Sequence, residues 1–105
     1  MQGTLYVISN PLFPNYIKIG YAKCLYSRLK KMSTSVPKAY TIENHVNLDN
    51  ARKIEGELHT HYRTDLCLNR GFVSTEWYPV GPKEFFDTIE DFIKDIKERI
   101  QKVKM

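Results

Sequence analysis

The sequence has few cysteines and no long hydrophobic segment. Only Cys24 and Cys67 occur among the 105 residues, and their spacing matches neither a zinc site nor a redox motif. This cysteine usage is typical of a reducing compartment. No apolar run approaches the length that crosses a bilayer, and the first residues do not resemble a signal peptide. We therefore expect an intracellular protein, cytoplasmic or nuclear, that is neither secreted nor inserted in a membrane.

Internal repeats and low-complexity segments are also missing from the sequence. A chain of this length predicts one domain, residues 1–105, with a modest hydrophobic core. Charge of one sign does not dominate, because 16 basic residues face 12 acidic ones and leave a net charge of +4. This small excess is compatible with an anionic partner such as nucleic acid, and equally with ordinary solubility.

Two short apolar segments near the N-terminus predict a β-hairpin. Gly3–Ser9 and Tyr16–Ala22 alternate around β-branched and aromatic residues, and turn-forming residues separate them. Six intervening residues are too few for a helical crossover, so we expect an antiparallel pair. Because side chains alternate between faces, Tyr6 and Lys18 are expected on one face. Gly20 leaves an open position beside them for a ligand or another backbone.

The rest of the chain predicts three helices and two more strands. Apolar residues at helical spacing, N-cap residues and Pro82 as a first helical residue predict helices over 23–32, over 51–63 and from Pro82 through Ile100. Alternating or short apolar segments predict strands over 40–48 and 76–79. The predicted fold is a small α/β (α+β) sandwich. Its three- to four-stranded mixed or antiparallel sheet is flanked by helices, in the order strand, strand, helix, strand, helix, strand, helix.

Glu55 is a carboxylate near the apolar stripe of the second predicted helix. Ala51, Glu55, Leu58 and Tyr62 lie at i, i+4, i+7 and i+11, so the side chain is expected close to the inward face. A buried, unpaired carboxylate costs several kcal/mol and therefore needs a cation, a hydrogen-bond partner or a functional reason. The alternative is a partly exposed glutamate that pairs with Arg52 or His59.

Basic residues gather on or near the first predicted helix and in a later loop. They can bind the backbone of nucleic acid, and the alternative is an ordinary set of solvated surface cations. The residues in question are Lys23, Lys30 and Lys31 near the helix, and Arg70 in the loop over 64–75.

The order and spacing of four motifs resemble the GIY-YIG nuclease superfamily. Thr4-Leu5-Tyr6 falls where the family has Gly-Ile-Tyr, and Lys18-Ile19-Gly20 falls where it has Tyr-Ile-Gly. Arg28, eight residues after Gly20, resembles the family's arginine, and Glu55 resembles its metal-binding glutamate. The resemblance covers roughly residues 3–80.

Two positions depart from the family pattern. Lys18 replaces the second motif tyrosine, and Met32 stands where a tyrosine or histidine is common. The Lys-Ile-Gly motif, Ser-Thr-Ser at 33–35 and Glu-Trp-Tyr at 76–78 resemble a short phage- and virus-associated branch that keeps this lysine.

The resemblance implies a metal-dependent DNA endonuclease that hydrolyses phosphodiester bonds, in DNA repair or recombination. In this reading Tyr6 activates the attacking water, and Lys18 beside it favours the phenolate or holds a phosphate. Arg28 neutralises charge on the scissile phosphate, since a guanidinium can bind phosphate through two hydrogen bonds. Glu55 holds one Mg²⁺ or Mn²⁺. Further helpers from the same neighbourhood are Tyr21, Tyr26 and His59.

Other functions remain open at this point. The fold can also serve as a nucleic-acid-binding module with weak or no catalysis, and the replacement of the second tyrosine favours that reading. A third reading is a protein-interaction domain whose long apolar C-terminal helix forms a dimer. As a nuclease, the chain is expected to bind DNA either as a homodimer or within a larger nuclease assembly.

Overall fold

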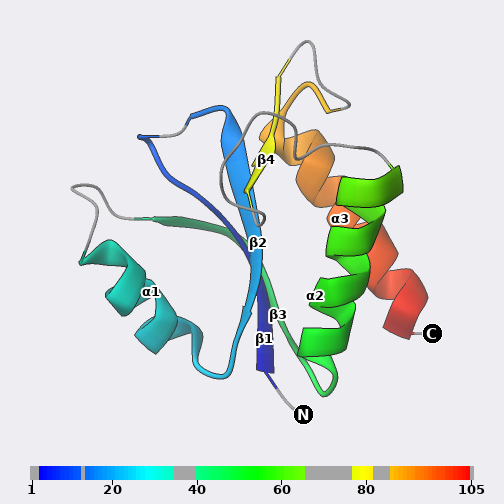
Figure 1. Ribbon diagram of the computed structural model, residues 1–105, viewed down its shortest axis with the longest axis horizontal. Helices are drawn as coiled ribbons and strands as arrows, with labels where there is room; N and C mark the ends of the chain where they lie inside the picture. The colour runs from blue at the N-terminus through cyan, green and yellow to red at the C-terminus, as the bar shows by residue number, and fades with distance from the viewer. Residues whose placement is uncertain (1–2, 13, 35–39, 66–76, 82–85, 105) are drawn as a thin grey trace.

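The computed structural model describes residues 3–12, 14–34, 40–65, 77–81 and 86–104. Four strands form one antiparallel sheet in the order β3-β1-β2-β4 (Figure 1). The strands are β1 (Gly3–Ser9), β2 (Tyr16–Ala22), β3 (Thr41–Leu48) and β4 (Trp77–Pro79). The predicted hairpin of the first two strands is confirmed, and so is the small α+β fold with a four-stranded sheet.

Helices cover both faces of this sheet. Helix α1 (Leu25–Ser33) lies on one side, and α2 (Ala51–Thr60) and α3 (Ile89–Lys104) lie together on the other (Figure 1). A π-helical turn, His61–Asp65, continues α2. None of the helices in the described part of the chain is both long and apolar enough to span a bilayer.

The alternation of side chains along the hairpin divides the core into two layers. Leu5 and Val7 pack with α2 and α3 in the larger layer. Tyr6 and Ile8 point the other way, into a smaller layer with Leu25, Leu29 and Met32 of α1. In the register of the hairpin, Tyr6 faces Gly20 and Ile8 faces Lys18. Tyr6 and Lys18 therefore share one face of the sheet, as the alternation predicts.

A cluster of aromatic rings joins the end of α2 to α3. The Phe92 ring centroid lies 4.8 Å from that of Tyr62 and 4.5 Å from that of Phe86. The Tyr62 hydroxyl donates a hydrogen bond of 2.8 Å to the Asp95 carboxylate, which also accepts one from Arg99 Nε at 3.2 Å. Burial, and then the hydrogen bond to Asp95, raise the pKa of Tyr62 far above its usual range, so the phenol stays protonated.

The start predicted for the last helix is wrong. The helix begins at Ile89, and Phe86 to Thr88, which the prediction included, are not helical; Pro82 lies outside the described residues. The Thr88 hydroxyl accepts the Asp91 backbone N–H at 3.1 Å, which makes Thr88 the residue that caps the helix. Buried Phe86 belongs to the core from the segment before the helix, although its spacing to the later apolar residues matches a helical stripe.

Candidate nucleic-acid site

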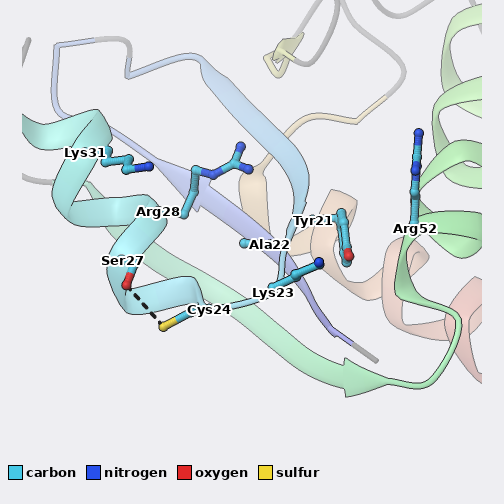
Figure 2. A pocket seen from close by; sticks show the side chains of 8 residues that line it. All are labelled: Tyr21, Ala22, Lys23, Cys24, Ser27, Arg28, Lys31 and Arg52. Atoms are coloured by element: carbon cyan, nitrogen blue, oxygen red, sulfur yellow. Dashed lines mark hydrogen bonds between the residues drawn. The ribbon is translucent and has the colours of Figure 1, made fainter. Parts of the chain in front are cut away.

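A pocket of about 470 Å³ opens where β2 ends, between α1 and the first turn of α2 (Figure 2). Within the described residues, three parts of the chain line it. The end of β2 and the link to α1 provide Tyr21, Ala22, Lys23 and Cys24. Helix α1 provides Ser27, Arg28 and Lys31, and α2 provides Arg52. We refer to this set of residues as the basic pocket.

The periodicity of α1 explains why its basic residues line the pocket. Leu25, Leu29 and Met32 lie at i, i+4 and i+7 and pack against the small core layer on the sheet. This anchoring leaves the neighbouring stripe, which carries Arg28 and Lys31, beside the end of β2. The same helical pattern that fixes α1 on the sheet therefore presents two cations to the pocket.

Among the described residues, the basic pocket is lined by four cationic side chains and by no carboxylate. All four are exposed to solvent: Lys23, Arg28, Lys31 and Arg52. None of them forms an ion pair with a residue in the described part of the chain. Such a concentration of one charge attracts anions, and arginine can bind a phosphate through two parallel hydrogen bonds. The pocket therefore has the chemistry of a phosphate-binding surface.

Cys24 is an exposed thiol on the wall of this pocket. The Ser27 hydroxyl donates a hydrogen bond to Cys24 Sγ at 3.4 Å (Figure 2). This hydroxyl, and next the backbone N–H of Ser27, lower the pKa of Cys24 below its ordinary value. The thiolate is therefore present at lower pH than in an unperturbed cysteine.

Replacing Ser27 by Ala is expected to raise the pKa of Cys24, because the thiolate loses the donor that lowers it most. In a Cys67→Ser background, the pH profile of Cys24 alkylation by iodoacetamide should move to higher pH. Ser27→Thr keeps a hydroxyl and should retain the wild-type profile. Identical profiles for Ser27→Ala and the wild type would contradict this assignment.

Only some of the residues that the sequence singles out line the pocket. Arg28, Lys23 and Lys31 line it, and so does the helper candidate Tyr21. Lys30 and Tyr26 are on α1 but are not among the residues that line the pocket. Tyr26 is 78% exposed. Arg70 lies outside the described residues.

Tyr6 lies on the sheet beneath α1, Lys18 shares its face of the sheet, and neither residue is among those that line the pocket. Tyr6 is fully buried, and its ring covers Gly20, the residue opposite it on β2. Lys18 is half-buried and pairs with Trp77 of β4 as well as with Ile8. The expected open position at Gly20 is thus filled by the phenol of Tyr6.

Glu55 is carried by α2, on the opposite side of the sheet from α1. Its side chain is 21% exposed, and Oε1 lies 3.6 Å from His59 Nε2. Nδ1 of buried His59 in turn hydrogen-bonds with the Tyr78 hydroxyl. The predicted contact between Glu55 and His59 is therefore present, and His59 is held between a carboxylate and a phenol. Glu55 follows Arg52 by three positions, which are neighbours on a helix surface.

Among the described residues, Glu55 belongs to no cluster of side chains that could enclose a divalent metal ion. Within the described residues, no group of three or more His, Cys, Asp or Glu side chains could hold a metal. Mg²⁺ commonly keeps several waters and binds through one or two carboxylates together with substrate phosphates. This donor set therefore fits a mostly hydrated ion completed by a phosphate, and does not fit a metal cage made by the protein alone.

Arg52 is the cationic residue among the described pocket residues that the sequence did not identify as functional. In the sequence it is one more cation on a helix, and its only suggested role is as a partner for Glu55. Its place in the pocket depends on how the start of α2 packs beside the end of β2, which are 29 residues apart (Ala51 minus Ala22). The available signal was its spacing of three residues from Glu55.

Comparison with known protein families gives a match over nearly the whole chain. The family model of the T5orf172 domain matches residues 3–101, nearly the whole chain. No curated protein and no solved structure matches significantly.

Proposed function

Because the chain belongs to the T5orf172 domain family, a phage-associated domain related to GIY-YIG-like endonucleases, we propose that it is a metal-dependent DNA endonuclease. The family is associated with a nuclease-like or nucleic-acid-binding function. The observation that carries the proposal is the basic pocket, where Arg28 and three other cations face solvent and no described lining residue is a carboxylate. This surface suits the phosphate backbone of DNA.

Arg28 is proposed to stabilise the transition state of hydrolysis. In this reaction a water oxygen bonds to phosphorus, and the bond from phosphorus to the 3′ oxygen breaks. Negative charge grows on the phosphate oxygens as the bonds exchange, and a guanidinium beside them stabilises that charge. Arg28 suits this role because it lines the pocket and has no carboxylate partner among the described residues.

Tyr6 is proposed to orient the attacking water or to take its proton, with Lys18 on the same face favouring the phenolate. Tyr6 is fully buried under α1 in this conformation. Its role therefore requires α1 to move away from the sheet when DNA binds. Such a movement is feasible because α1 contributes no fully buried side chain to the core.

Glu55 is proposed to hold one hydrated Mg²⁺ or Mn²⁺ together with a phosphate of the DNA. When bound, the ion supplies positive charge that stabilises the leaving 3′ oxygen. His59 is proposed to fix the orientation of the Glu55 carboxylate, because its ring lies between Glu55 and the Tyr78 hydroxyl.

The second candidate is a DNA-binding module that has the fold without the chemistry. The burial of Tyr6 favours it, since a phenol covered by a helix cannot reach substrate without rearrangement. The basic pocket serves both functions equally, so metal-dependent cleavage separates the two.

Arg28→Ala tests the proposal at the pocket. Its cleavage of supercoiled plasmid with Mg²⁺ or Mn²⁺ is expected to fall by about two orders of magnitude, which is typical when a donor to transition-state charge is removed. Lys30→Ala is the matched control, because it removes a positive charge from the same helix outside the pocket. Its rate should stay within about twofold of the wild type, as is usual for a solvated surface charge. Equal rates for the two variants would exclude the role of Arg28.

A further inference from the structure

We propose that Arg52 of α2 binds a backbone phosphate of a nucleic-acid strand that lies in the basic pocket and bridges α1 and α2. The inference deepens the proposed function and rests on it in one respect, that the ligand is nucleic acid. It does not require cleavage, so binding alone can test it.

Arg52 reaches the basic pocket from a different part of the chain than the other cations. The other lining residues come from α1 or from the end of β2 and its link to α1, whereas Arg52 comes from α2 (Figure 2). Figure 2 shows Arg28 and Lys31 on one wall and Arg52 on the other, with Tyr21 and Lys23 between them. An anion that contacts both walls must therefore extend across the end of β2.

The charge of Arg52 is not neutralised by a described carboxylate. Arg52 is exposed and has no ion-pair partner among the described residues, while the nearby Glu55 carboxylate contacts His59. Four like charges around one pocket favour a ligand with several negative charges over a single small anion. A nucleic-acid backbone supplies such a row of charges, because each nucleotide adds one phosphate.

The basic pocket also contains side chains that are not charged. Besides its cations, the pocket offers the Tyr21 ring, the Ser27 hydroxyl and the Cys24 thiol. Hydroxyl groups of serine and tyrosine beside cations are typical donors to the phosphate backbone of nucleic acid.

A nucleic-acid strand that bridges α1 and α2 would also pass close to Glu55. Arg52 and Glu55 are neighbours at i and i+3 on α2. A phosphate bound by Arg52 would bring the strand next to the carboxylate that is proposed to hold the metal. Arg28 contacts the same strand from the opposite wall. The DNA itself would thus connect two functional groups that α1 and α2 carry on different sides of the sheet.

Arg52→Ala and Lys53→Ala form a matched pair for the test. Both remove one exposed positive charge from the first turn of α2, but Lys53 does not line the basic pocket. Binding is measured by fluorescence anisotropy with a fluorescein-labelled DNA duplex and its single strand, in EDTA and over a series of salt concentrations. EDTA removes divalent metal, so cleavage does not affect the result.

We expect Arg52→Ala to weaken binding about tenfold, as for a hydrogen-bonded charge pair. The slope of log K against log salt should fall by about 0.7 to 0.9, the value for one lost phosphate contact. Lys53→Ala should keep both the affinity, within about twofold, and the slope. Equal behaviour of the two variants would overturn the inference, even if the wild type cleaves DNA. A specific effect of Arg52→Ala in a protein that never cleaves would support the inference and reject the endonuclease.

Alkylation of Cys24 locates the strand without a change to Arg52. In a Cys67→Ser protein, saturating DNA should slow the reaction of Cys24 with iodoacetamide by about fivefold or more, because exposed Cys24 lies on the pocket wall. An unchanged rate at saturating DNA would place the strand elsewhere and overturn the inference.

Discussion

Replacing Glu55 by Gln is expected to abolish metal-dependent cleavage of DNA, with a loss of about three orders of magnitude, while DNA is still bound. Gln keeps the shape of the side chain but removes the negative charge that would hold the metal. A metal ion contributes several kcal/mol to transition-state stabilisation, and each 1.4 kcal/mol is about a tenfold change in rate. DNA binding should persist, because Glu55 does not line the basic pocket.

Glu57→Gln is the matched control for this variant. Glu57 is an exposed glutamate on α2, two positions after Glu55, and it does not line the basic pocket. Cleavage is followed by the conversion of supercoiled plasmid to open circle, and binding by anisotropy in EDTA. Full activity of Glu55→Gln would remove Glu55 from the metal site, and equal losses in both variants would point to a general effect of charge.

Gly20→Ala is expected to destabilise the protein and to displace Tyr6. A Cβ at position 20 would overlap the Tyr6 ring and would lie 2.8 Å from Tyr6 Cε1. Tyr6 is fully buried, so its ring can yield only if α1 or the hairpin shifts. Overpacking of this kind lowers the free energy of unfolding by about 1–3 kcal/mol. Urea denaturation measures the loss, and cleavage should fall with it if Tyr6 acts on the water.

Gly56→Ala should have the opposite effect on stability. Gly56 lies within α2, and a Cβ there would meet no atom within 4 Å. Alanine has the higher helix propensity, so the free energy of unfolding should rise by about 0.5–1 kcal/mol.

A stable, fully active Gly20→Ala protein would contradict the prediction for Gly20. It would show that the packing of the Tyr6 ring against Gly20 matters neither for stability nor for cleavage.

The local parts of the fold could be predicted from the sequence. The alternation in Gly3–Ser9 and Tyr16–Ala22, with a short turn-rich link, was enough to predict an antiparallel hairpin and to put Tyr6 and Lys18 on one face. The predicted start of α3 was wrong because the spacing of Phe86 to the later apolar residues matches a helical stripe. The helix begins at Ile89, directly after Thr88, which caps it.

The candidate site was only partly predictable, because its walls meet through tertiary packing. The spacing of Arg28 from Gly20 singled out Arg28 as a candidate to bind phosphate, and the structure puts Arg28 in the basic pocket. Arg52 could not be assigned from its neighbours, since its role depends on α2 lying beside the end of β2. The amphipathic pattern of α1 indicated that it packs on the sheet, but not that it buries Tyr6 completely.

Cleavage by the wild-type protein tests the central claim most directly. Supercoiled plasmid and branched DNA are incubated with Mg²⁺, with Mn²⁺ and with EDTA, and the ends of the products are identified. A metal-dependent endonuclease that breaks the bond to the 3′ oxygen will nick these substrates only with metal and leave 3′-hydroxyl ends. An absence of products at every metal concentration, with salt-sensitive DNA binding preserved, would contradict the claim and identify a binding module.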